Sequence, residues 1–457
     1  MENNFDVMIL GGGPAGYTAA LRAAQNGLSV ALAENKDVGG TCLNRGCIPT
    51  KALLHSGELI EQARHASDYG VNCGETTFDL AKIYQRRDEV VMRLRTGVEK
   101  LIAARKITLL RGTASFVDAT HVKVDQQVYT AKDFVISTGS VPATLPIEGM
   151  DLCVNSDYLL EGTNDIPEEI VIVGGGVIGV EFAEFLLALG KKVTVVEYMD
   201  RILPTMDRDV SLQHALALKK KGAVINTGAG VTKVTKDDKY TVYFTDKKGD
   251  KQVSADLVIV STGRRANTKG LNAEGVGLEL NRGAIVVNQE YQTNLPHVYA
   301  IGDCIGGIQL AHFAAAQGEY VADKLAGIKN PVNLSVVPSC IYSSPEIAAV
   351  GMTQAQATEK GIETEVGKFP MGANGKSIIA GADRGFVKTV FEKSSGKLLG
   401  AVLYCDRATD IIGELTLAVA NGLTREHIER AIHPHPTIDE AVGESALASV
   451  GKAIHTL

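Results

Sequence analysis

Residues 5–16 read FDVMILGGGPAG, a short apolar run that ends in a cluster of glycines. The apolar run has the length and composition of a buried strand, and the residues after it have the pattern of a helix. Gly11, Gly13 and Gly16 have the G-x-G-x-x-G spacing that joins such a strand to such a helix. The next strand ends on Glu34, about 20 residues further on, where this motif places an acidic residue. The sequence therefore predicts a dinucleotide-binding βαβ unit.

Each residue of this motif has a physical task. Gly11 permits the tight turn, Gly13 lets the backbone approach a pyrophosphate, and Gly16 lets the helix pack on the strand. The start of the helix presents free N–H groups to the phosphates, and Glu34 accepts a hydrogen bond from a ribose hydroxyl. The alternative is that the glycines only turn a corner between strand and helix. The complete context of strand, helix and acid favours the dinucleotide.

A second copy of the motif lies downstream. Residues 169–179 read EIVIVGGGVIG, with Gly174, Gly176 and Gly179 at the same spacing. The apolar run EIVIV, residues 169–173, is the predicted strand, and a helix follows to Gly190. The next strand, KVTVVE over residues 192–197, ends on Glu197, which matches the place of the acid in the first copy. An acid at this position repels a 2′-phosphate, so we expect the second site to prefer NAD over NADP.

The two halves also end alike. In each half an apolar strand ends in Ser-Thr-Gly, which places Thr138 and Gly139 in the first half and Gly263 in the second. Such a repeat indicates the duplication of one structural unit.

A third strand then runs into Gly302 and Asp303 before another helical stretch. Asp303 is either the N-cap of that helix or an acceptor for a polyhydroxyl chain, with the helix start facing a pyrophosphate.

Two cysteines lie close together in residues 39–54, GGTCLNRGCIPTKALL. Pro49 suits the first turn of a helix, which would place Cys47 at the amino end of that helix. There the helix dipole stabilises a thiolate, so we expect Cys47 to be more acidic than Cys42. Taken alone, the pair suits redox chemistry and a structural role about equally. Zinc is disfavoured because no second pair of ligands follows.

The remaining stretches predict a long helix and a separate domain. Apolar residues recur at helical spacing over residues 83–105, which we expect to be ordinary core. From residue 337 onward, strands alternate with amphipathic helices without further glycine motifs.

Near the end, His435 lies between two prolines and Glu440 follows five residues later. A histidine oriented by a carboxylate is the arrangement that a general base needs.

The bulk properties exclude several classes of protein. The chain has 457 residues, enough for about three domains. A formal net charge of −7 argues against nucleic acid as a partner. The longest apolar stretch is too short to span a bilayer, and the acidic amino terminus does not read as a signal peptide. We therefore expect a cytoplasmic protein without a membrane or metal partner, whose seven cysteines lie in a reducing compartment.

Together, these motifs resemble the flavin-dependent pyridine nucleotide disulfide oxidoreductases, and among them the enzymes that oxidise dihydrolipoyl groups with NAD+. The resemblance covers almost the whole chain. It implies an α/β fold with two Rossmann-like domains, which bind FAD and NAD, and a C-terminal α+β domain for dimerisation. The implied boundaries are 1–143 for the FAD domain with its redox disulfide, 144–265 for the NAD domain, 266–336 for a central segment that completes the FAD site, and 337–457 for the dimer interface.

The resemblance also implies roles for the catalytic residues. Cys42 and Cys47 match the active disulfide, in which Cys42 exchanges with substrate and Cys47 lies against the flavin. Lys51 and Glu181 match an ion pair near the reactive nitrogen of the flavin. The implied acid–base dyad is His435 and Glu440, and it reaches the dithiol of the other subunit of a homodimer. The cofactor-binding residues implied are Gly11, Gly13, Gly16, Glu34, Lys51, Thr138, Gly139, Asp303, Ala311, Gly174, Gly176, Gly179, Glu197 and Gly263.

The implied partner is a lipoyl-bearing domain of a 2-oxo acid dehydrogenase complex or of the glycine cleavage complex. Two other readings stay open. Another disulfide reductase, acting on glutathione or mercuric ion, would want arginines in place of Glu197 or an extra redox pair at the carboxyl end, and the chain ends GKAIHTL. A flavoprotein scaffold, in which the disulfide only braces the fold, predicts resistance to mild thiols.

Overall fold

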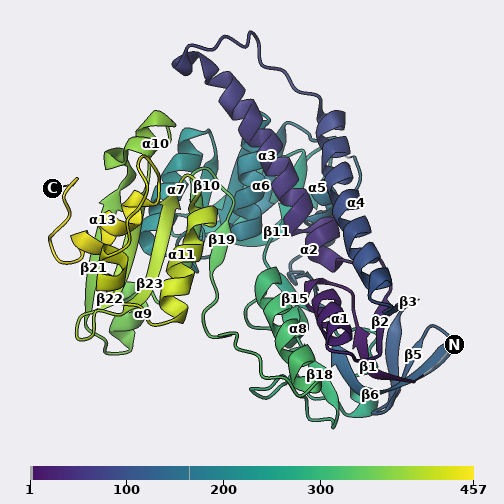
Figure 1. The fold of residues 1–457 in the computed structure, drawn as a ribbon. Helices are drawn as coiled ribbons and strands as arrows, with labels where there is room; N and C mark the ends of the chain where they lie inside the picture. Colours follow the sequence, from purple (N-terminus) through teal and green to yellow (C-terminus); the bar gives the residue numbers. More distant parts are fainter. Residues whose placement is uncertain (1–3, 164, 457) are drawn as a thin grey trace. The chain divides into compact units, whose positions relative to one another are not determined.

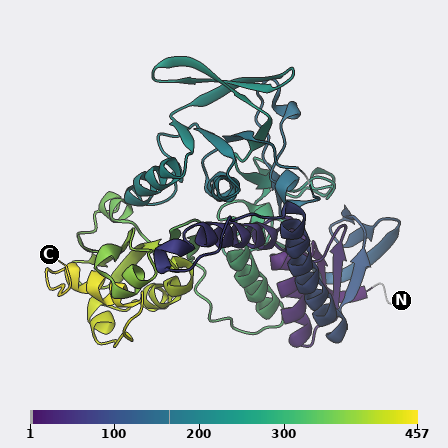
Figure 2. The same cartoon turned by 90° about the horizontal axis from the view of Figure 1, so that it is seen from above.

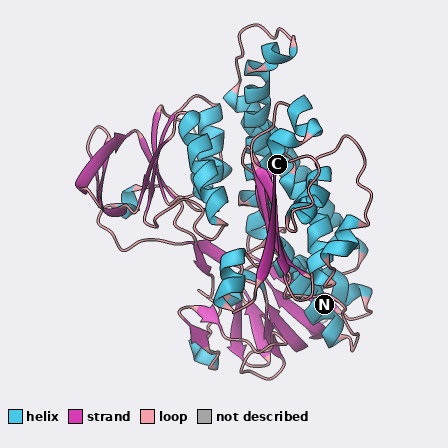
Figure 3. Cartoon of the chain, turned by 90° about the vertical axis from the view of Figure 1, so that its left-hand side faces the viewer, coloured by secondary structure: helices cyan, strands magenta, loops and turns pink. Residues whose placement is uncertain are grey.

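The computed structural model describes residues 4–163 and 165–456, which form two compact units. The first unit comprises the described residues within Met1–Pro146, Val154–Ile166 and Val260–Leu334. The second unit comprises those within Ile147–Cys153, Pro167–Ile259 and Ser335–Leu457. Both units combine helices and strands (Figures 1 and 3), so the predicted α/β fold class is confirmed.

The first unit is built on a sheet whose central strands are parallel. Strand β1 lies between β2 and β6, with β3 beyond β2 and β18 paired to β6. These strands span Asn4–Leu10 (β1), Val30–Glu34 (β2), Thr108–Arg111 (β3), Gln127–Ile136 (β6) and Val298–Ala300 (β18). Strands β4 (Ala114–Asp118) and β5 (His121–Val124) extend the sheet in antiparallel fashion from β6. Strand β1, which precedes the glycines of the first motif, and β2, which ends on Glu34, are therefore neighbours in one sheet.

Helix α1 (Pro14–Gln25) follows β1 directly and has proline as its first residue, where the missing N–H costs nothing. It packs against α8 (Ala311–Leu325). The approach is close because a Cβ added to Gly318 of α8 would lie 2.5 Å from the Ala15 carbonyl oxygen. The other elements of this unit are α2 (Gly40–Arg45), α3 (Cys47–Arg64), α4 (Leu80–Ala104), α5 (Asp157–Leu160), β7 (Ser140–Pro142), β15 (Arg264–Ala266), β16 (Leu280–Asn281) and β17 (Ala284–Ile285).

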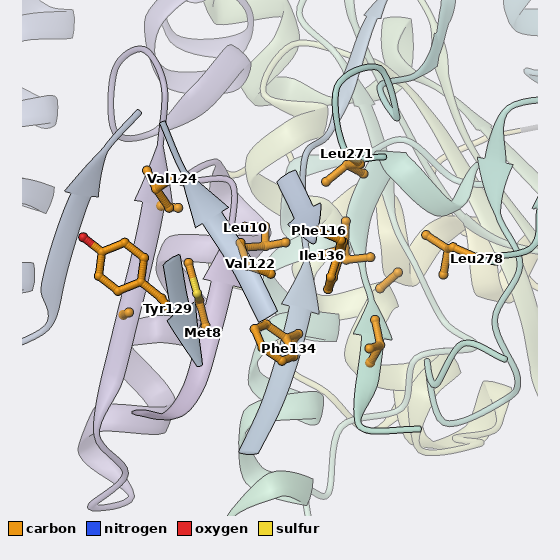
Figure 4. Packing of buried hydrophobic residues seen from close by; sticks show 14 of the residues in the cluster. Met8, Leu10, Phe116, Val122, Val124, Tyr129, Phe134, Ile136, Leu271 and Leu278 are labelled. Carbon is orange, nitrogen blue, oxygen red and sulfur yellow. The ribbon is translucent and has the colours of Figure 1, made fainter. Parts of the chain in front are cut away.

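Apolar side chains from both parts of the sheet form one core (Figure 4). Met8 and Leu10 of β1 and Ile136 of β6 are wholly buried there. Phe116 and Phe134 meet edge to face, with ring centroids 5.6 Å apart. Aromatic rings favour this geometry, because the positive edge of one ring faces the negative face of the other.

The long helix predicted over residues 83–105 is α4, which runs beside α3 and begins earlier, at Leu80. Asp79 caps it by accepting a hydrogen bond from a backbone N–H of the first turn. The expectation of an ordinary core helix is wrong for part of its length. Leu94 and Leu101 have 43% and 51% of their surface exposed. Apolar periodicity indicates a helix, but it does not show which apolar residues are covered.

The second unit begins with a four-stranded parallel sheet in the order β10-β9-β8-β14. Its elements are β8 (Glu169–Val173), α6 (Val177–Ala188), β9 (Lys192–Glu197), α7 (Arg208–Lys220), β10 (Val224–Thr227) and β14 (Leu257–Val260). The bounds of β8 and β9 are those that the second motif predicts. A separate antiparallel sheet, drawn in teal in Figure 2, consists of β11 (Gly230–Lys236), β12 (Tyr240–Asp246) and β13 (Gly249–Ala255).

The rest of the second unit is an antiparallel sheet in the order β19-β20-β23-β22-β21. Helix α11 (Ala408–Ala420) packs on β20 and β23, and α13 (Glu440–Ala448) packs on β21 and β22. A Cβ added to Gly367 of β21 would lie 1.7 Å from the Ser445 carbonyl oxygen, so only glycine fits below α13. The remaining bounds are β19 (Ser339–Ile341), β20 (Glu346–Gly351), α9 (Gln354–Glu359), β21 (Thr364–Pro370), α10 (Gly375–Ile379), β22 (Phe386–Glu392), β23 (Leu398–Cys405) and α12 (Arg425–Glu429).

Among the helices that the structure describes, none combines the length and the apolar character that a membrane crossing requires.

His214 of α7 is wholly buried, and this burial gives a testable dependence of stability on pH. Burial lowers its pKa to about 3, with a smaller contribution from the charge of Lys221. The unfolded chain takes up a proton near pH 6.5 and the folded chain does not, so stability falls as the pH drops from 6.5 toward 3. We expect His214 to account for about 2 kcal/mol of the stability lost between pH 7 and pH 5.

Thermal unfolding at the two pH values tests this prediction. The drop in melting temperature between pH 7 and pH 5 should be smaller in His214→Gln than in the parent protein, because glutamine does not titrate. His55, whose side chain is 69% exposed, provides the control, and His55→Gln should keep the drop of the parent. An equal drop in all three proteins would contradict the prediction.

Candidate active site and cofactor sites

The first glycine motif forms a loop in which glycine is required at two positions. Gly11 has φ +109°, and a Cβ there would lie 2.4 Å from the Ser137 carbonyl oxygen. A Cβ on Gly16 would lie 1.8 Å from the Gly11 carbonyl oxygen. At Gly13, in contrast, an added Cβ would meet no protein atom closer than 3.9 Å, namely Cα of Gly40. The protein's own packing therefore leaves the space over Gly13 open.

Glu34 lies at the end of β2 and fastens the glycine loop. Its carboxylate accepts the Gly12 N–H at 2.7 Å through one oxygen and the Lys36 N–H at 2.7 Å through the other. Each carboxylate oxygen has a second lone pair, so Glu34 can still accept a hydroxyl hydrogen bond. The side chain is nearly buried, and its charge is held at the mouth of the loop.

The second motif repeats this geometry. Glu197, also nearly buried, accepts the Gly175 N–H at 2.5 Å and the Met199 N–H at 2.6 Å. Gly174 has φ +108°, close to the value at Gly11 of the first motif. A Cβ on Gly176 would meet nothing within 4 Å, and Gly179 is buried in α6.

Both loops fit a dinucleotide. Helices α1 and α6 each begin directly after their loop, and no side chain caps either of these described helices. The N–H groups of the first turn are therefore available to phosphate oxygens. The open space over Gly13 and Gly176 lies where a pyrophosphate must approach the backbone. The acids at the ends of β2 and β9 are held at the same two places relative to their loops.

Asp303 lies in a short 3₁₀ turn, Gly302–Ile305, and α8 begins only later, after Leu310. The N-cap interpretation of Asp303 is therefore wrong. Its carboxylate instead accepts a hydrogen bond from the Ser140 hydroxyl at 2.6 Å. Arg264 donates to the same hydroxyl oxygen and to the Ser140 carbonyl oxygen, both at 2.7 Å. Burial lowers the pKa of Arg264, and the charge of Asp303 opposes that shift.

Four further predicted positions lie in the first unit. Thr138 donates its hydroxyl hydrogen to the Asn267 carbonyl oxygen at 2.6 Å. Gly139 and Gly263 have φ values of +71° and +105°, which favour glycine. Ala311 is the first residue of α8.

The cysteine segment begins in contact with the first glycine loop. Gly40 has φ +56°, and a Cβ there would lie 2.6 Å from Cα of Gly13. Cys42 lies in α2, and Cys47 is the first residue of α3, as predicted. Both are in the reduced, thiol form in this structure. The hydrogen bond with the Cys47 thiol, together with burial, raises the pKa of Cys42, while Lys51 acts in the opposite direction. Two sulfurs in contact are what a reversible disulfide requires.

A groove of about 700 Å³ opens beside this segment. Two ion pairs lie along it, Arg45 with Glu161 at 3.1 Å and Arg95 with Asp37 at 2.6 Å. Arg45 lines the groove and stands between the two cysteines in the sequence, but neither cysteine is among the lining residues.

His435 and Glu440 form a hydrogen-bonded pair in the second unit. Nδ1 of His435 lies 2.9 Å from one carboxylate oxygen, and the Thr437 N–H donates to the other at 2.9 Å. Glu440 is the first residue of α13, where the helix dipole favours a negative charge. Burial raises the pKa of Glu440, but the hydrogen bonds from Thr437 and His435 outweigh it and lower the pKa overall. The His435 side chain is 78% exposed.

Lys51 and Glu181 belong to different units. Lys51 lies on α3, within electrostatic reach of Cys42. Glu181 lies on α6, is 3% exposed, and accepts the Tyr342 N–H at 3.1 Å. Their pairing beside a flavin stays a prediction, as does the reach of His435 to the thiols of another subunit.

Sequence reasoning missed Ser140, which donates to Asp303, and Arg264, which donates to Ser140. The signal for Arg264 was present, because this residue directly follows the second Thr-Gly repeat. Ser140 follows the first repeat in the same way. The duplicated motif therefore extends one residue further than its glycines suggest.

Comparison with known families agrees with this geometry. A family model described as pyridine nucleotide-disulphide oxidoreductase matches residues 5–318, and the model of the dimerisation domain of that family matches residues 337–446. The chain therefore belongs to the pyridine nucleotide-disulphide oxidoreductases. It is an FAD flavoprotein that uses NAD(H), and the predicted family and cofactors are confirmed.

Individual relatives narrow the class. A dihydrolipoyl dehydrogenase of Bacillus subtilis (strain 168) is 42% identical over 477 residues, with 100% of both chains covered. A dihydrolipoyl dehydrogenase of Geobacillus stearothermophilus is 37% identical and covers 99% of this chain and 97% of its own. Among solved structures, the HOCl-induced flavoprotein disulfide reductase RclA from Escherichia coli has a TM-score of 0.86 at 29% identity, with 96% of this chain and 99% of that chain covered.

Proposed function

We propose that this protein is a dihydrolipoyl dehydrogenase, which oxidises dihydrolipoyl groups to lipoyl groups with NAD+. The observation that carries the proposal is the contact of the Cys42 and Cys47 thiols at the amino end of α3. This segment touches the first glycine loop, where the FAD pyrophosphate fits. Full-length relatives of that name, at 37% and 42% identity, support the choice of substrate.

Bound FAD and NAD+ supply the transfer of an electron pair from the dithiol to the nicotinamide. The chain holds these cofactors through the two glycine loops and through Glu34 and Glu197. Asp303 is fixed by Ser140 and serves as the acceptor for the hydroxyls of the flavin side chain. The protein thus contributes position and charge, and the cofactors contribute the redox chemistry.

The thiol exchange proceeds in two steps from the oxidised pair. One substrate thiolate attacks the sulfur of Cys42, the bond between Cys42 and Cys47 breaks, and Cys47 leaves as a thiolate. The second substrate thiolate then attacks the substrate sulfur bound to Cys42, which closes the lipoyl ring and releases Cys42. The substrate has lost two electrons and two protons, and the protein dithiol holds the electron pair. The start of α3 stabilises the thiolate of Cys47.

His435 is the base for this exchange. Its Nδ1–H is held by Glu440, which leaves Nε2 to accept a proton from a substrate thiol. The carboxylate also stabilises the imidazolium that forms. Because the chain contains the dimerisation domain of its family, we place the His435 of one protomer against the thiols of the other in a homodimer.

We also propose a partner and a compartment. The lipoyl group arrives on a lipoyl-bearing domain of a 2-oxo acid dehydrogenase complex or of the glycine cleavage complex. The protein works in the cytoplasm. A reducing compartment suits a chain with seven cysteines that needs its thiols available for exchange.

Side-by-side assays test this function. The holoenzyme should reduce NAD+ with dihydrolipoamide, and should show far lower activity with glutathione disulfide or mercuric ion and NADPH. Higher turnover with either of these substrates would assign another disulfide reductase. Addition of one equivalent of dithiol should produce a long-wavelength band from a thiolate next to the flavin. Absence of that band would favour a scaffold whose disulfide only braces the fold.

Removal of the Glu197 carboxylate should weaken NAD+ binding specifically. Glu197→Ala removes a charged acceptor, and such hydrogen bonds contribute roughly 1.5–3 kcal/mol, so KM for NAD+ should rise roughly 10- to 100-fold. The matched variant is Glu34→Ala in the first loop, which should lower the flavin content, while the fraction that keeps its flavin should keep the parent KM for NAD+. Steady-state kinetics and the flavin-to-protein absorbance ratio give the two readouts. An unchanged KM in Glu197→Ala would contradict the assignment.

A further inference from the structure

Helix α6 carries two buried carboxylates one turn apart. Glu181 is 3% exposed and Glu184 is 7% exposed. Residues three positions apart on a helix lie on the same face, so both side chains leave α6 in similar directions. A buried carboxylate is costly unless hydrogen bonds and opposite charges surround it. The hydrogen-bond and ion-pair partners of the two carboxylates therefore show which part of the chain this face of α6 holds.

Both carboxylates hold the same segment of chain. Strand β19 (Ser339–Ile341) leads into residues 342–344. The Tyr342 N–H donates to Oε1 of Glu181 at 3.1 Å. The Ser344 N–H donates to Oε1 of Glu184 at 3.4 Å. The segment is thus tied to α6 at two points, one for each carboxylate.

Lys221 completes the hold on this segment. Its Nζ lies 2.5 Å from Oε2 of Glu184 and 3.4 Å from the Ser344 carbonyl oxygen. Glu184 and Lys221 therefore bind the N–H and the C=O of the same residue. The ion pair neutralises the buried charge of Glu184 and fixes the peptide groups on both sides of the Ser344 Cα.

His214 lines the other side of Glu184. Its Nε2 lies 3.5 Å from Oε1 of Glu184 and has no hydrogen-bond partner within the residues that the structure describes. Its Nδ1 lies 3.4 Å from the Tyr404 hydroxyl, and the two rings meet at 90° with centroids 5.9 Å apart. This arrangement leaves the carboxylate little freedom to move away from Ser344.

We propose that Glu184, together with Lys221, is a positioning residue for Glu181. The clamp on Ser344 fixes residues 342–344, and that segment supplies the N–H that orients the Glu181 carboxylate. The inference rests on the proposed function and on the predicted pairing of Glu181 with Lys51 beside the flavin. A carboxylate displaced by about 1 Å can lose a large share of its effect, as much as about 100-fold in rate.

A double-mutant cycle tests this coupling in the FAD-loaded enzyme. The variants are Glu184→Ala, Glu181→Gln and the combination of the two. The readouts are the rate of flavin reduction by NADH in stopped flow and the fraction of flavin reduced at a fixed NADH/NAD+ ratio. The second readout reports the flavin potential, which a purely structural loss would not change. Glu184→Ala should lower the rate about tenfold in the parent and have no further effect in Glu181→Gln.

Additional variants control for disruption of the fold. Lys221→Met breaks the same clamp and should reproduce the change in flavin reduction. Lys220→Met, at the exposed neighbouring position of α7, should leave it unchanged. Glu184→Gln keeps an acceptor for the Ser344 N–H and should restore part of the loss.

The outcomes separate the two proposals. A response of the flavin to Glu181→Gln, combined with an additive response to Glu184→Ala, overturns the inference and leaves the role of Glu181 intact. A flavin that does not respond to Glu181→Gln overturns the role of Glu181 itself, and the inference falls with it. Unchanged flavin reduction in both Glu184→Ala and Lys221→Met, with a normal response to Glu181→Gln, overturns the clamp.

Discussion

Replacing Cys47 by serine is expected to abolish NAD+ reduction by dihydrolipoamide, with a loss of about a thousandfold or more. A hydroxyl cannot form the disulfide that the exchange needs, nor can it leave as a stabilised thiolate from the start of α3. Serine keeps the size of the side chain, so the fold and the flavin content should not change. Turnover in the lipoamide assay is the measurement, and activity within tenfold of the parent would refute the mechanism.

Two comparisons separate the role of Cys47 from general damage. Oxidation of NADH with ferricyanide bypasses the thiols and should survive in Cys47→Ser. Cys42→Ser should also lose lipoamide turnover, but it keeps the sulfur assigned to the flavin side. This variant should therefore show the long-wavelength thiolate band at rest, and Cys47→Ser should lack it. If the band followed Cys42 instead, the roles of the two sulfurs would be reversed.

Replacing His435 by glutamine should lower dihydrolipoamide oxidation by about 10²- to 10⁴-fold, the usual contribution of a general base. The hydrogen bonds that lower the pKa of Glu440 keep this carboxylate ionised and able to hold Nδ1–H. Glu440→Gln should therefore cause a smaller loss in the same half-reaction. Stopped-flow reduction by dihydrolipoamide measures the effect, and reduction of the flavin by NADH should stay near the parent rate.

The same region offers a matched control. His455 pairs with Glu444 of α13 through Nδ1 at 2.8 Å, and its side chain is 69% exposed. This pair has the chemistry of the His435 pair without the flanking prolines. His455→Gln should leave the dithiol half-reaction unchanged. If the rate of the dithiol half-reaction fell equally in His435→Gln and His455→Gln, the loss would be due to a general effect of charge, and His435 would not be the base.

The parts of the fold that sequence predicted best are those whose determinants are local. The glycine spacing, the strand before it and the acid after it all lie within one βαβ unit, so β8 and β9 were predicted to the residue. The start of α3 at Cys47 was predictable for the same reason, because Pro49 signals a first turn. The pairing of strands from distant segments, such as β18 with β6, has no such local signal.

The misses depend on contacts between distant segments. Arg87 of α4 is 1% exposed because its guanidinium donates to the carbonyl oxygens of Leu159 and Gly162. The apolar periodicity of a helix does not predict the burial of a charged residue whose carbonyl partners lie more than seventy positions away in the sequence. For Asp303 the sequence left two interpretations open, a cap and a hydroxyl acceptor, for a similar reason, since its partner Ser140 lies in β7, far away along the chain. Tertiary context overrides local pattern at these positions.

The close approach of Gly40 to Gly13 links the binding of the FAD pyrophosphate to the position of the redox thiols. The backbone that receives the pyrophosphate and the backbone that begins the redox segment lie so close that a Cβ on Gly40 would be 2.6 Å from Cα of Gly13. A change in the glycine loop can therefore impair both cofactor binding and thiol exchange, because a shift of one of these two backbone segments displaces the other. Inactivation of this enzyme by loss of its prosthetic group should accordingly be accompanied by faster alkylation of its thiols.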